Sequence, residues 1–302
     1  MNRKQKDRFS SFFKHLLLTF VAIFTVYPVI WIVMGSFNPG SSLFTAQVIP
    51  GMNWSLFWEG MRQFDFHTVM ESFRSIRLTL THYSHLFQET NYLLWYKNTL
   101  KIAFWNMVLS TFLVVTAAYA FSRFRFPGRK QGLMTMLVLQ MFPGFMGMIA
   151  IYILLLQLNL LDNHWGLVLV YAGGSIPFNA WIVKGYFDTL PKSLEEAAKI
   201  DGAGNATIFA RVLMPLSVPI LVFVAVSNFI GPWMDFIFAR LVLRSNENKT
   251  LAIGLFEMVT GRGNTEFTLF AAGAVLVAVP ITILFMMFQR FMVEGLKAGA
   301  NK

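Results

Sequence analysis

SLEEAAKIDGAGNATIFARVLMP, residues 193–215, places three acidic and two basic side chains between long apolar stretches of the chain. Ser193 followed by Glu196 has the spacing of a capping box, in which a hydroxyl and a carboxylate bond to the free N–H groups at a helix start. Gly202 is expected to end this first short helix. The sequence therefore predicts a short, capped helix in this stretch, whereas a loop that only connects two spans would need no helix.

A second short helix is expected in the same stretch. Gly204 and Asn205 offer a turn and a new cap, and Pro215 is expected to stop the helix. Between them an apolar stripe is formed by Ile208, Phe209, Val212 and Leu213. The alternative is a solvated loop that merely joins two spans, but two caps, a stripe and the adjacent alanines 197–198 favour a docking element.

The composition indicates that lipid surrounds most of the chain. Of the 302 residues, 56% are hydrophobic and only 13% are charged, whereas soluble proteins carry about 25% charged residues. The net charge of +10 would suggest nucleic acid as a partner of a soluble protein. Here the basic residues lie beside apolar runs, so membrane topology explains them and no nucleic acid partner is predicted. The chain has no cysteine, which excludes disulfides and thiolate metal sites.

Six apolar runs are long enough to cross a bilayer, which takes about 20 residues. The first follows a basic N-terminal segment, residues 1–15, and is interpreted as an uncleaved anchor because no small-residue cleavage site follows it. The predicted spans are 16–37, 98–121, 131–157, 164–186, 216–241 and 267–291.

The distribution of Lys and Arg predicts the orientation. With the N-terminus inside, the inner segments carry about twice as many of these residues as the outer segments. Both termini and residues 191–215 are then cytoplasmic. The long segment 38–97 is extracytoplasmic and rich in aromatic residues, which suit the membrane interface, or alternatively a sugar or partner surface. A metal site at His82 and His85 lacks a further ligand, and no metal is predicted.

Several motifs together resemble the permease subunits of ABC importers. Glu196-Ala197-Ala198, then Gly202 and Val212-x-Met214-Pro215, are similar to the EAA motif of that family, with Val212 and Met214 as mild departures. Further motifs resemble carbohydrate permeases, in particular the smaller permease of maltose/maltodextrin importers. They are Lys184-Gly-Tyr-Phe187, Pro215-Leu-Ser-Val-Pro219, Tyr119-Ala-Phe-Ser-Arg-Phe-Arg-Phe-Pro-Gly128, Gln140-Met-Phe-Pro143 and Gly295-Leu-Lys-Ala-Gly299.

The resemblance implies an all-α integral membrane protein with six transmembrane helices in a type I ABC-importer permease bundle. Residues 98–302 would form a five-helix core, and residues 191–215 a cytoplasmic coupling helix that docks on an ATPase subunit. The expected docking residues are Glu195, Glu196, Ala197, Ala198, Asp201 and Gly202. The chain has no phosphate-binding Gly-x4-Gly-Lys-Ser/Thr motif. ATP-Mg would therefore bind to the partner ATPase subunits, and this chain would have no catalytic residue and no cofactor.

The substrate path is predicted from polar residues and broken helices at membrane depth. The candidates are Gln140, Asn179, Asn228 and Asp235. Asp235 lies in Trp233-Met-Asp-Phe236, which resembles a family pattern although Met234 replaces a polar residue. The alternative is helix packing, because proline and small residues are common where membrane helices touch.

These observations predict a permease of the bacterial cytoplasmic membrane that imports an oligosaccharide. The expected partners are a sister permease, two ATPase subunits, an extracytoplasmic solute-binding protein and the lipid bilayer. An ion-coupled secondary transporter is the first alternative, but the spans hold few acidic relay residues. An intramembrane enzyme is the second, but all five histidines lie at span ends or in loops.

Overall fold

In a computed structural model, residues 3–41, 49–74, 76–260 and 266–300 can be described. Within these residues all regular elements are helical, which confirms the predicted all-α fold. The helices form two compact units, one made of Met1–Asn91 with Leu255–Ala278 and the other of Tyr92–Gly254 with Val279–Lys302. Helices α14 (Leu251–Thr260) and α15 (Phe267–Ala300) each run from one unit into the other.

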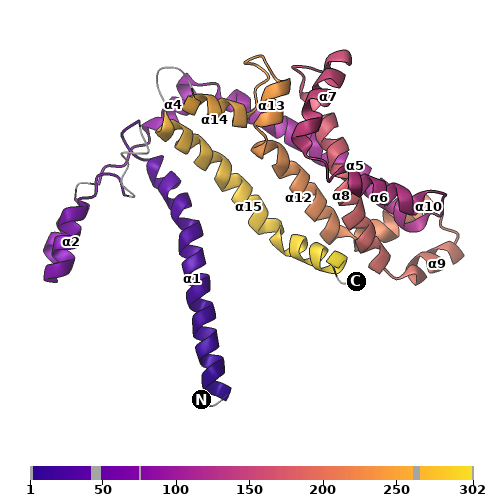
Figure 1. Ribbon diagram of the computed structural model, residues 1–302, viewed down its shortest axis with the longest axis horizontal. Coiled ribbons are helices and arrows are strands. Elements are labelled where there is room, and N and C mark those ends of the chain that lie inside the picture. The colour runs from indigo at the N-terminus through magenta and orange to yellow at the C-terminus, as the bar shows by residue number, and fades with distance from the viewer. Residues whose placement is uncertain (1–2, 42–48, 75, 261–265, 301–302) are drawn as a thin grey trace. The chain divides into compact units, whose positions relative to one another are not determined.

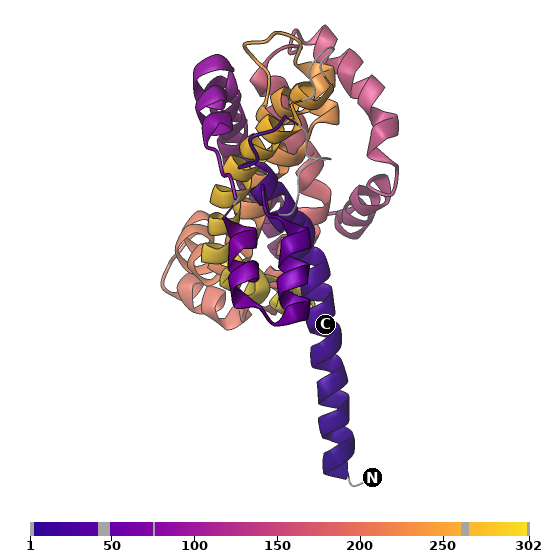
Figure 2. The same ribbon diagram turned by 90° about the vertical axis from the view of Figure 1, so that its left-hand side faces the viewer.

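The first unit contains a long apolar helix and a group of short helices. These are α1 (Arg3–Gly35), α2 (Trp54–Gln63), α3 (Phe66–Phe73) and α4 (Thr81–Glu89). The paired helices α2 and α3 lie side by side (Figure 2). They approach closely at Gly60, where a Cβ atom would lie 2.7 Å from the backbone nitrogen of Val69. Helix α4 is tied to the end of α1 by the Tyr83 hydroxyl, 2.7 Å from Ser36 Oγ.

The second unit is built on three long helices that pack on one another: α5 (Tyr92–Arg123), α8 (His164–Thr189) and α12 (Val218–Met234) (Figure 1). Two apolar clusters form its core, one around Leu167 and Val242, the other around Phe187 and Ile220. A polar contact joins α5 to α12, since Asn106 Nδ2 donates to the carbonyl of Asn228 at 2.7 Å. Such contacts are typical of packed membrane helices.

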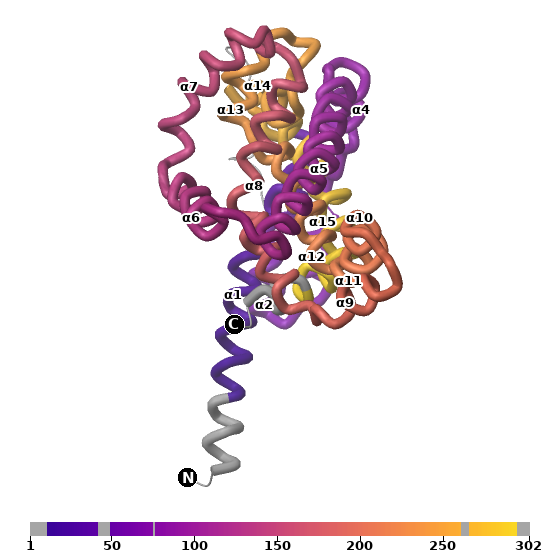
Figure 3. Tube along the Cα trace, turned by 90° about the vertical axis from the view of Figure 1, so that its right-hand side faces the viewer, coloured from indigo at the N-terminus to yellow at the C-terminus, as the bar shows by residue number. Residues whose placement is uncertain are grey.

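One predicted span, 131–157, is bent within its length, and another, 216–241, begins at a bend. Helices α6 (Arg129–Leu139) and α7 (Gly144–Gln157) meet at 100°, and together they curve away from α8 (Figure 3). Pro143 explains the break, because proline donates no backbone hydrogen bond and disfavours helical geometry in the residue before it. The helical stretch Asn205–Leu216 meets α12 at 82°. Among the residues that the structure describes, four helices are long and apolar enough to cross a membrane, or up to six when each bent pair counts as one span.

The predicted fifth span, 216–241, is shorter in the structure. Helix α12 ends at Met234, because Asp235 adopts an extended conformation with ψ of 112°. A separate short helix, α13 (Ile237–Val242), follows. Asp235 Oδ1 accepts the backbone N–H of Phe238 at 3.1 Å, so this carboxylate caps the start of α13.

Candidate functional site

The predicted coupling segment begins with helix α9 (Lys192–Ile200). The capping box predicted at Ser193 is wrong: the cap position is Pro191, two residues earlier, the helix starts at Lys192, and no side chain caps its N-terminus. Proline at this boundary has a fixed φ of −59°, which is compatible with a helix start. Glu196 is exposed, and the buried carboxylate of this turn is that of Glu195.

The predicted bend at Gly202 is confirmed. Gly202 has φ of +83°, a left-handed conformation that favours glycine. The N–H of Ala203 donates to the carbonyl of Ala198 at 2.9 Å, and the N–H of Gly202 donates to Lys199 at 3.0 Å. This pair of bonds satisfies the last carbonyls of α9 and fixes the direction in which the chain leaves it.

The second short helix is continuous but irregular. It comprises α10 (Asn205–Ile208), the π-helical turn η1 (Phe209–Leu213) and α11 (Met214–Leu216). The cap position of α10 is Gly204, and Asn205 is the first helical residue. The predicted side-chain cap at Asn205 is therefore absent. Its apolar stripe points inward, with Ile208 and Leu213 fully buried. The helix ends at Leu216, one residue after Pro215, and the adjacent π turn accommodates a proline that cannot donate to the carbonyl four positions back.

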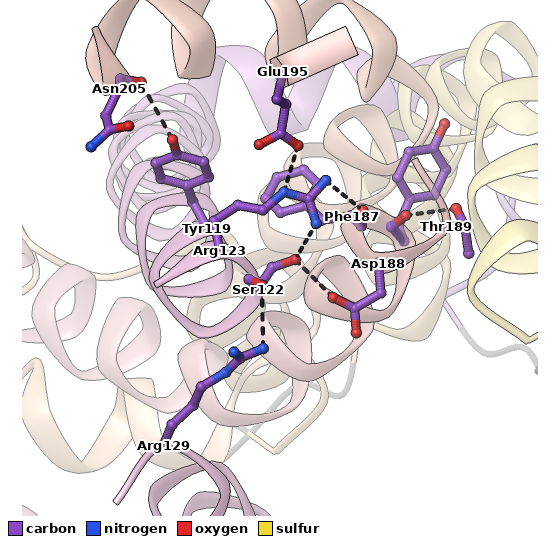
Figure 4. Close-up of polar contacts among 10 residues, drawn as sticks. Tyr119, Ser122, Arg123, Arg129, Phe187, Asp188, Thr189, Glu195 and Asn205 are labelled. Carbon is purple, nitrogen blue, oxygen red and sulfur yellow. Dashed lines mark hydrogen bonds and ion pairs between the residues drawn. The ribbon is translucent and has the colours of Figure 1, made fainter. Parts of the chain in front are cut away.

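Glu195 forms a buried ion pair with Arg123, the last residue of α5. Arg123 Nε lies 2.6 Å from Glu195 Oε1, and the side chains are 8% and 10% exposed. The other guanidinium nitrogens donate to Ser122 Oγ at 2.8 Å and to the carbonyl of Phe187 in α8 at 2.9 Å (Figure 4). One arginine therefore connects α5, α8 and α9.

The network extends further along α8. Ser122 Oγ donates to Asp188 Oδ1 at 2.8 Å, and Lys184 Nζ pairs with Asp188 Oδ2 at 2.5 Å. On the other side of Arg123, the Tyr119 hydroxyl donates to the carbonyl of Asn205 at 3.4 Å (Figure 4). Both halves of the coupling segment are thus held against the end of α5.

A polar hollow of about 330 Å³ lies between the end of α5 and the coupling segment. Basic side chains line it at Arg125, Lys192 and Lys199, together with the exposed Glu196. Of the six predicted docking residues, Glu196, Ala197, Asp201 and Gly202 are exposed and Ala198 is half-buried. Glu195 differs from them because it is turned inward to Arg123. A partner could therefore contact one face of α9 while the opposite face stays fixed to this chain.

Sequence reasoning missed the roles of Arg123, Ser122 and Asp188. Arg123 and Lys184 both lie in motifs that carry the family resemblance, but those motifs are far apart in the sequence. A pairing partner 72 positions away is not visible in a local pattern. The only local indication was an arginine at the end of a predicted span.

The four predicted path residues occupy different environments. Gln140 lies in the exposed break between α6 and α7 and donates to the carbonyl of Gly174 at 3.0 Å. Asn179 is half-buried and donates to Ser175 in its own helix at 2.9 Å. Asn228 is buried, and Asp235 accepts the Tyr171 hydroxyl at 2.5 Å as well as capping α13. Their role in transport stays a prediction.

No group of three potential metal-ligating side chains occurs within the described ranges. The two histidines weighed as ligands have other contacts. His82 Nε2 lies 2.7 Å from the carbonyl of Asn38, and His85 lies 3.2 Å from Glu89.

Residues 110–297 match the family described as "Binding-protein-dependent transport system inner membrane component". The chain is also similar to curated transport permeases over nearly its whole length. It is 40% identical to the galactooligosaccharides transport system permease protein GanQ of Bacillus subtilis, covering 96% of this chain and 95% of that one. It is 38% identical to the maltodextrin permease protein MdxG of the same organism, covering all of both chains. Against the maltodextrin permease protein MalD of Streptococcus pneumoniae the identity is 37%, over 99% and 98% of the two chains.

Solved structures share the fold. One chain of a bacterial ABC transporter involved in the import of the acidic polysaccharide alginate matches with a TM-score of 0.77 at 22% identity, covering 97% of this chain and 99% of that chain. A chain from the alginate transporter in complex with a pentasaccharide-bound periplasmic protein matches with a TM-score of 0.63 at 14% identity, covering 97% and 98%. These likenesses confirm the importer-permease bundle predicted from the sequence.

Proposed function

This chain belongs to the family of binding-protein-dependent transport system inner membrane components, and from that premise we propose that it forms half of the membrane pathway of an ATP-driven oligosaccharide importer. The other half would be a homologous sister permease. Two ATPase subunits would bind ATP-Mg on the cytoplasmic side, and an extracytoplasmic solute-binding protein would deliver the sugar. The main support for the proposal is that one face of α9 is exposed, while Glu195 on its opposite face is paired with Arg123 of α5.

In this mechanism ATPase closure pushes on α9 through Glu196, Ala197, Ala198, Asp201 and Gly202. Motion of a short helix reaches the bundle only if the helix is attached to it. The Arg123 guanidinium provides that attachment, because its bonds reach both Glu195 and the carbonyl of Phe187. We assign Glu195 to the inner side of the coupling helix, as a positioning residue that holds α9 to α5, and Glu196 to the outer side, where it meets the ATPase.

The substrate class is proposed from the relatives and from the path residues. Relatives at 37–40% identity are named for galactooligosaccharides and maltodextrins, so a neutral oligosaccharide is the expected cargo. Gln140 and Asn179 are the better path candidates because both are accessible. Amide groups suit sugar hydroxyls, since each offers two donors and an acceptor. Asn228 and Asp235 remain candidates, although the Asn228 amide already donates to the carbonyl of Val224 and the Asp235 carboxylate already accepts the Tyr171 hydroxyl.

The coupling role is tested by replacing Glu196 with Ala and Gly202 with Val. Each variant should lose sugar uptake, and the ATPase subunits should no longer co-purify with the permease pair. Thr207→Ala, an exposed position on α10 that the motif leaves open, is the matched control and should retain both. Uptake and co-purification that survive both motif changes would refute the assignment.

The cargo and the energy source are tested on the purified complex. ATPase activity should rise when a solute-binding protein loaded with the right oligosaccharide is added, across a panel of glucans and galactans. Uptake should persist in vesicles whose ion gradients have been collapsed, provided that ATP is present. Uptake that follows the gradient and not ATP would favour the secondary-transporter alternative instead.

A further inference from the structure

A second hollow lies between the start of α6 and the last turns of α8. Its volume is about 530 Å³, and it is separate from the one beside α9. The side chains that line it combine three cations with three apolar groups: Arg129, Lys130, Lys184, Phe126, Leu133 and Met134. Lys184 and Arg129 also contact the network around Arg123, through Asp188 and the carbonyl of Ser122, whereas the coupling mechanism does not use Lys130 or the apolar residues.

The cations are not fully neutralised by this chain. Lys184 pairs with Asp188, and Arg129 donates to the carbonyls of Ser122 and Phe124 at 3.2 and 3.3 Å, which leaves its charge uncompensated. Lys130 is exposed, and its amine has no hydrogen-bond or ion-pair partner among the residues that the structure describes. The first turn of α6 contains no acidic residue to offset this charge. The hollow therefore has an excess of positive charge that suits an anion.

The apolar part of the hollow continues along α6. No residue of α6 is buried, and Met134, Val138 and Leu139 are 57%, 53% and 62% exposed. A small soluble anion would gain nothing from this surface. A molecule with an anionic head and long apolar tails would fill both parts, with the head among the cations and the tails beside α6.

We propose that this hollow binds the phosphate headgroup of an anionic phospholipid, with its acyl chains along α6. Basic pockets between membrane helices are a recurrent site for such headgroups. The positive-inside tendency accounts for basic residues near a span end, but it does not place three of them around one hollow with an apolar wall. Lipid binding itself does not depend on the proposed function. Only the choice of leaflet does, because the proposed orientation places the hollow on the cytoplasmic side.

The test uses the assembled transporter in nanodiscs of phosphatidylcholine with graded amounts of phosphatidylglycerol. Native mass spectrometry then counts the phosphatidylglycerol molecules retained after partial delipidation. Lys130→Gln should weaken retention roughly 5-fold, the effect of one lysine near an anionic surface, and Lys130→Arg should retain it. Lys14→Gln is the matched control: it removes the same charge from an exposed lysine near the N-terminus and should change retention less than twofold.

Three results would overturn the proposal. Equal losses for Lys130→Gln and Lys14→Gln would mean unspecific attraction to the membrane. Displacement of the lipid by millimolar inorganic phosphate would mean a site for the free ion. Unchanged lipid retention with loss of the ATPase subunits in Lys130→Gln would mean an acidic protein surface as the occupant. Lipid retention is counted without transport, so failure of oligosaccharide import would refute the proposed function alone.

Discussion

At the scale of single residues, the buried Arg123–Glu195 pair is the contact on which the coupling segment depends most. Both side chains are nearly removed from solvent, so deleting one partner leaves the other charge uncompensated. Arg123→Met should therefore lower the free energy of unfolding by about 3–5 kcal/mol. Glu195→Gln should be milder, because an amide oxygen can still accept from the guanidinium. Thermal unfolding of the purified complex measures both effects.

Variants of the same pair can also distinguish its effect on stability from its effect on coupling. The double variant Arg123→Met with Glu195→Met removes both charges, so it should recover most of the stability lost in Arg123→Met. It should not recover uptake, because the Arg123 bonds that connect Glu195 of α9 to α5 and to the carbonyl of Phe187 are then lost. Full uptake in the double variant would show that packing alone transmits the motion.

Asp162 lies outside the predicted spans, and its charge stabilises the loop that contains Arg244 and Ser245. Burial opposes ionisation of Asp162, but the N–H groups of Ser245 and Arg244 donate to Oδ1 at 3.0 and 2.8 Å and lower the pKa of the carboxyl. A lowered pKa stabilises the folded loop above the ordinary pKa of aspartate, and this stabilisation is lost as the pH falls through the lowered value. Protection of these two amides from hydrogen exchange should fall in that acidic range.

Asp162→Asn is the matched variant for this pH dependence. Asp162 has φ of 54°, a conformation that asparagine also tolerates, so the backbone should be retained. The amide oxygen still accepts both bonds but has no charge to titrate. Protection of the amides of Arg244 and Ser245 should then be weaker and independent of pH, and a variant that kept the acid-induced loss would exclude Asp162 as its cause.

At the scale of elements, the close approach of α14 to α5 depends on Gly254. A Cβ atom at Gly254 would lie 2.1–2.5 Å from the ring of Trp95, which is itself only 9% exposed. Gly254→Ala should therefore destabilise the protein by about 1–3 kcal/mol, the usual effect of overpacking. The control is Gly147→Ala on α7, where nothing lies within 4 Å of the new atom and the higher helix propensity of alanine should be neutral or favourable. Equal melting temperatures for the two variants would contradict the prediction.

The elements also show what a single sequence can predict. Apolar runs and charge placement locate the spans, because length and hydrophobicity are local properties. The bends at Pro143 and Ser217 could be suspected from nearby prolines, but their angles depend on contacts such as Gln140 with Gly174, which are distant in the sequence. For the same reason the sequence placed Glu195 on the ATPase side, whereas the structure turns it to Arg123.

At the scale of the whole molecule, the proposed orientation predicts which loops lie outside the cell. Because the chain has no cysteine, introduced cysteines can test this. An introduced cysteine is the only thiol in the chain, so an impermeant maleimide added outside the cell reports its side without background. Glu59→Cys and Asn246→Cys should react in intact cells, because residues 38–97 and the loop after α13 are predicted to be outside. Arg125→Cys and Lys199→Cys should react only after the cells are opened.

All four positions are exposed in the structure, so lack of reaction in intact cells reports the membrane and not burial. Labelling of Lys199→Cys from outside would place α9 away from any cytoplasmic ATPase, and the coupling mechanism would then fail regardless of the EAA motif. Labelling of all four from outside would indicate damaged cells, which a cytosolic cysteine protein detects in the same sample. The expected pattern, two positions outside and two inside, requires an odd number of crossings between Glu59 and Arg125 and again between Lys199 and Asn246. This pattern is compatible with the bent helical stretch from Asn205 to Met234 acting as one span.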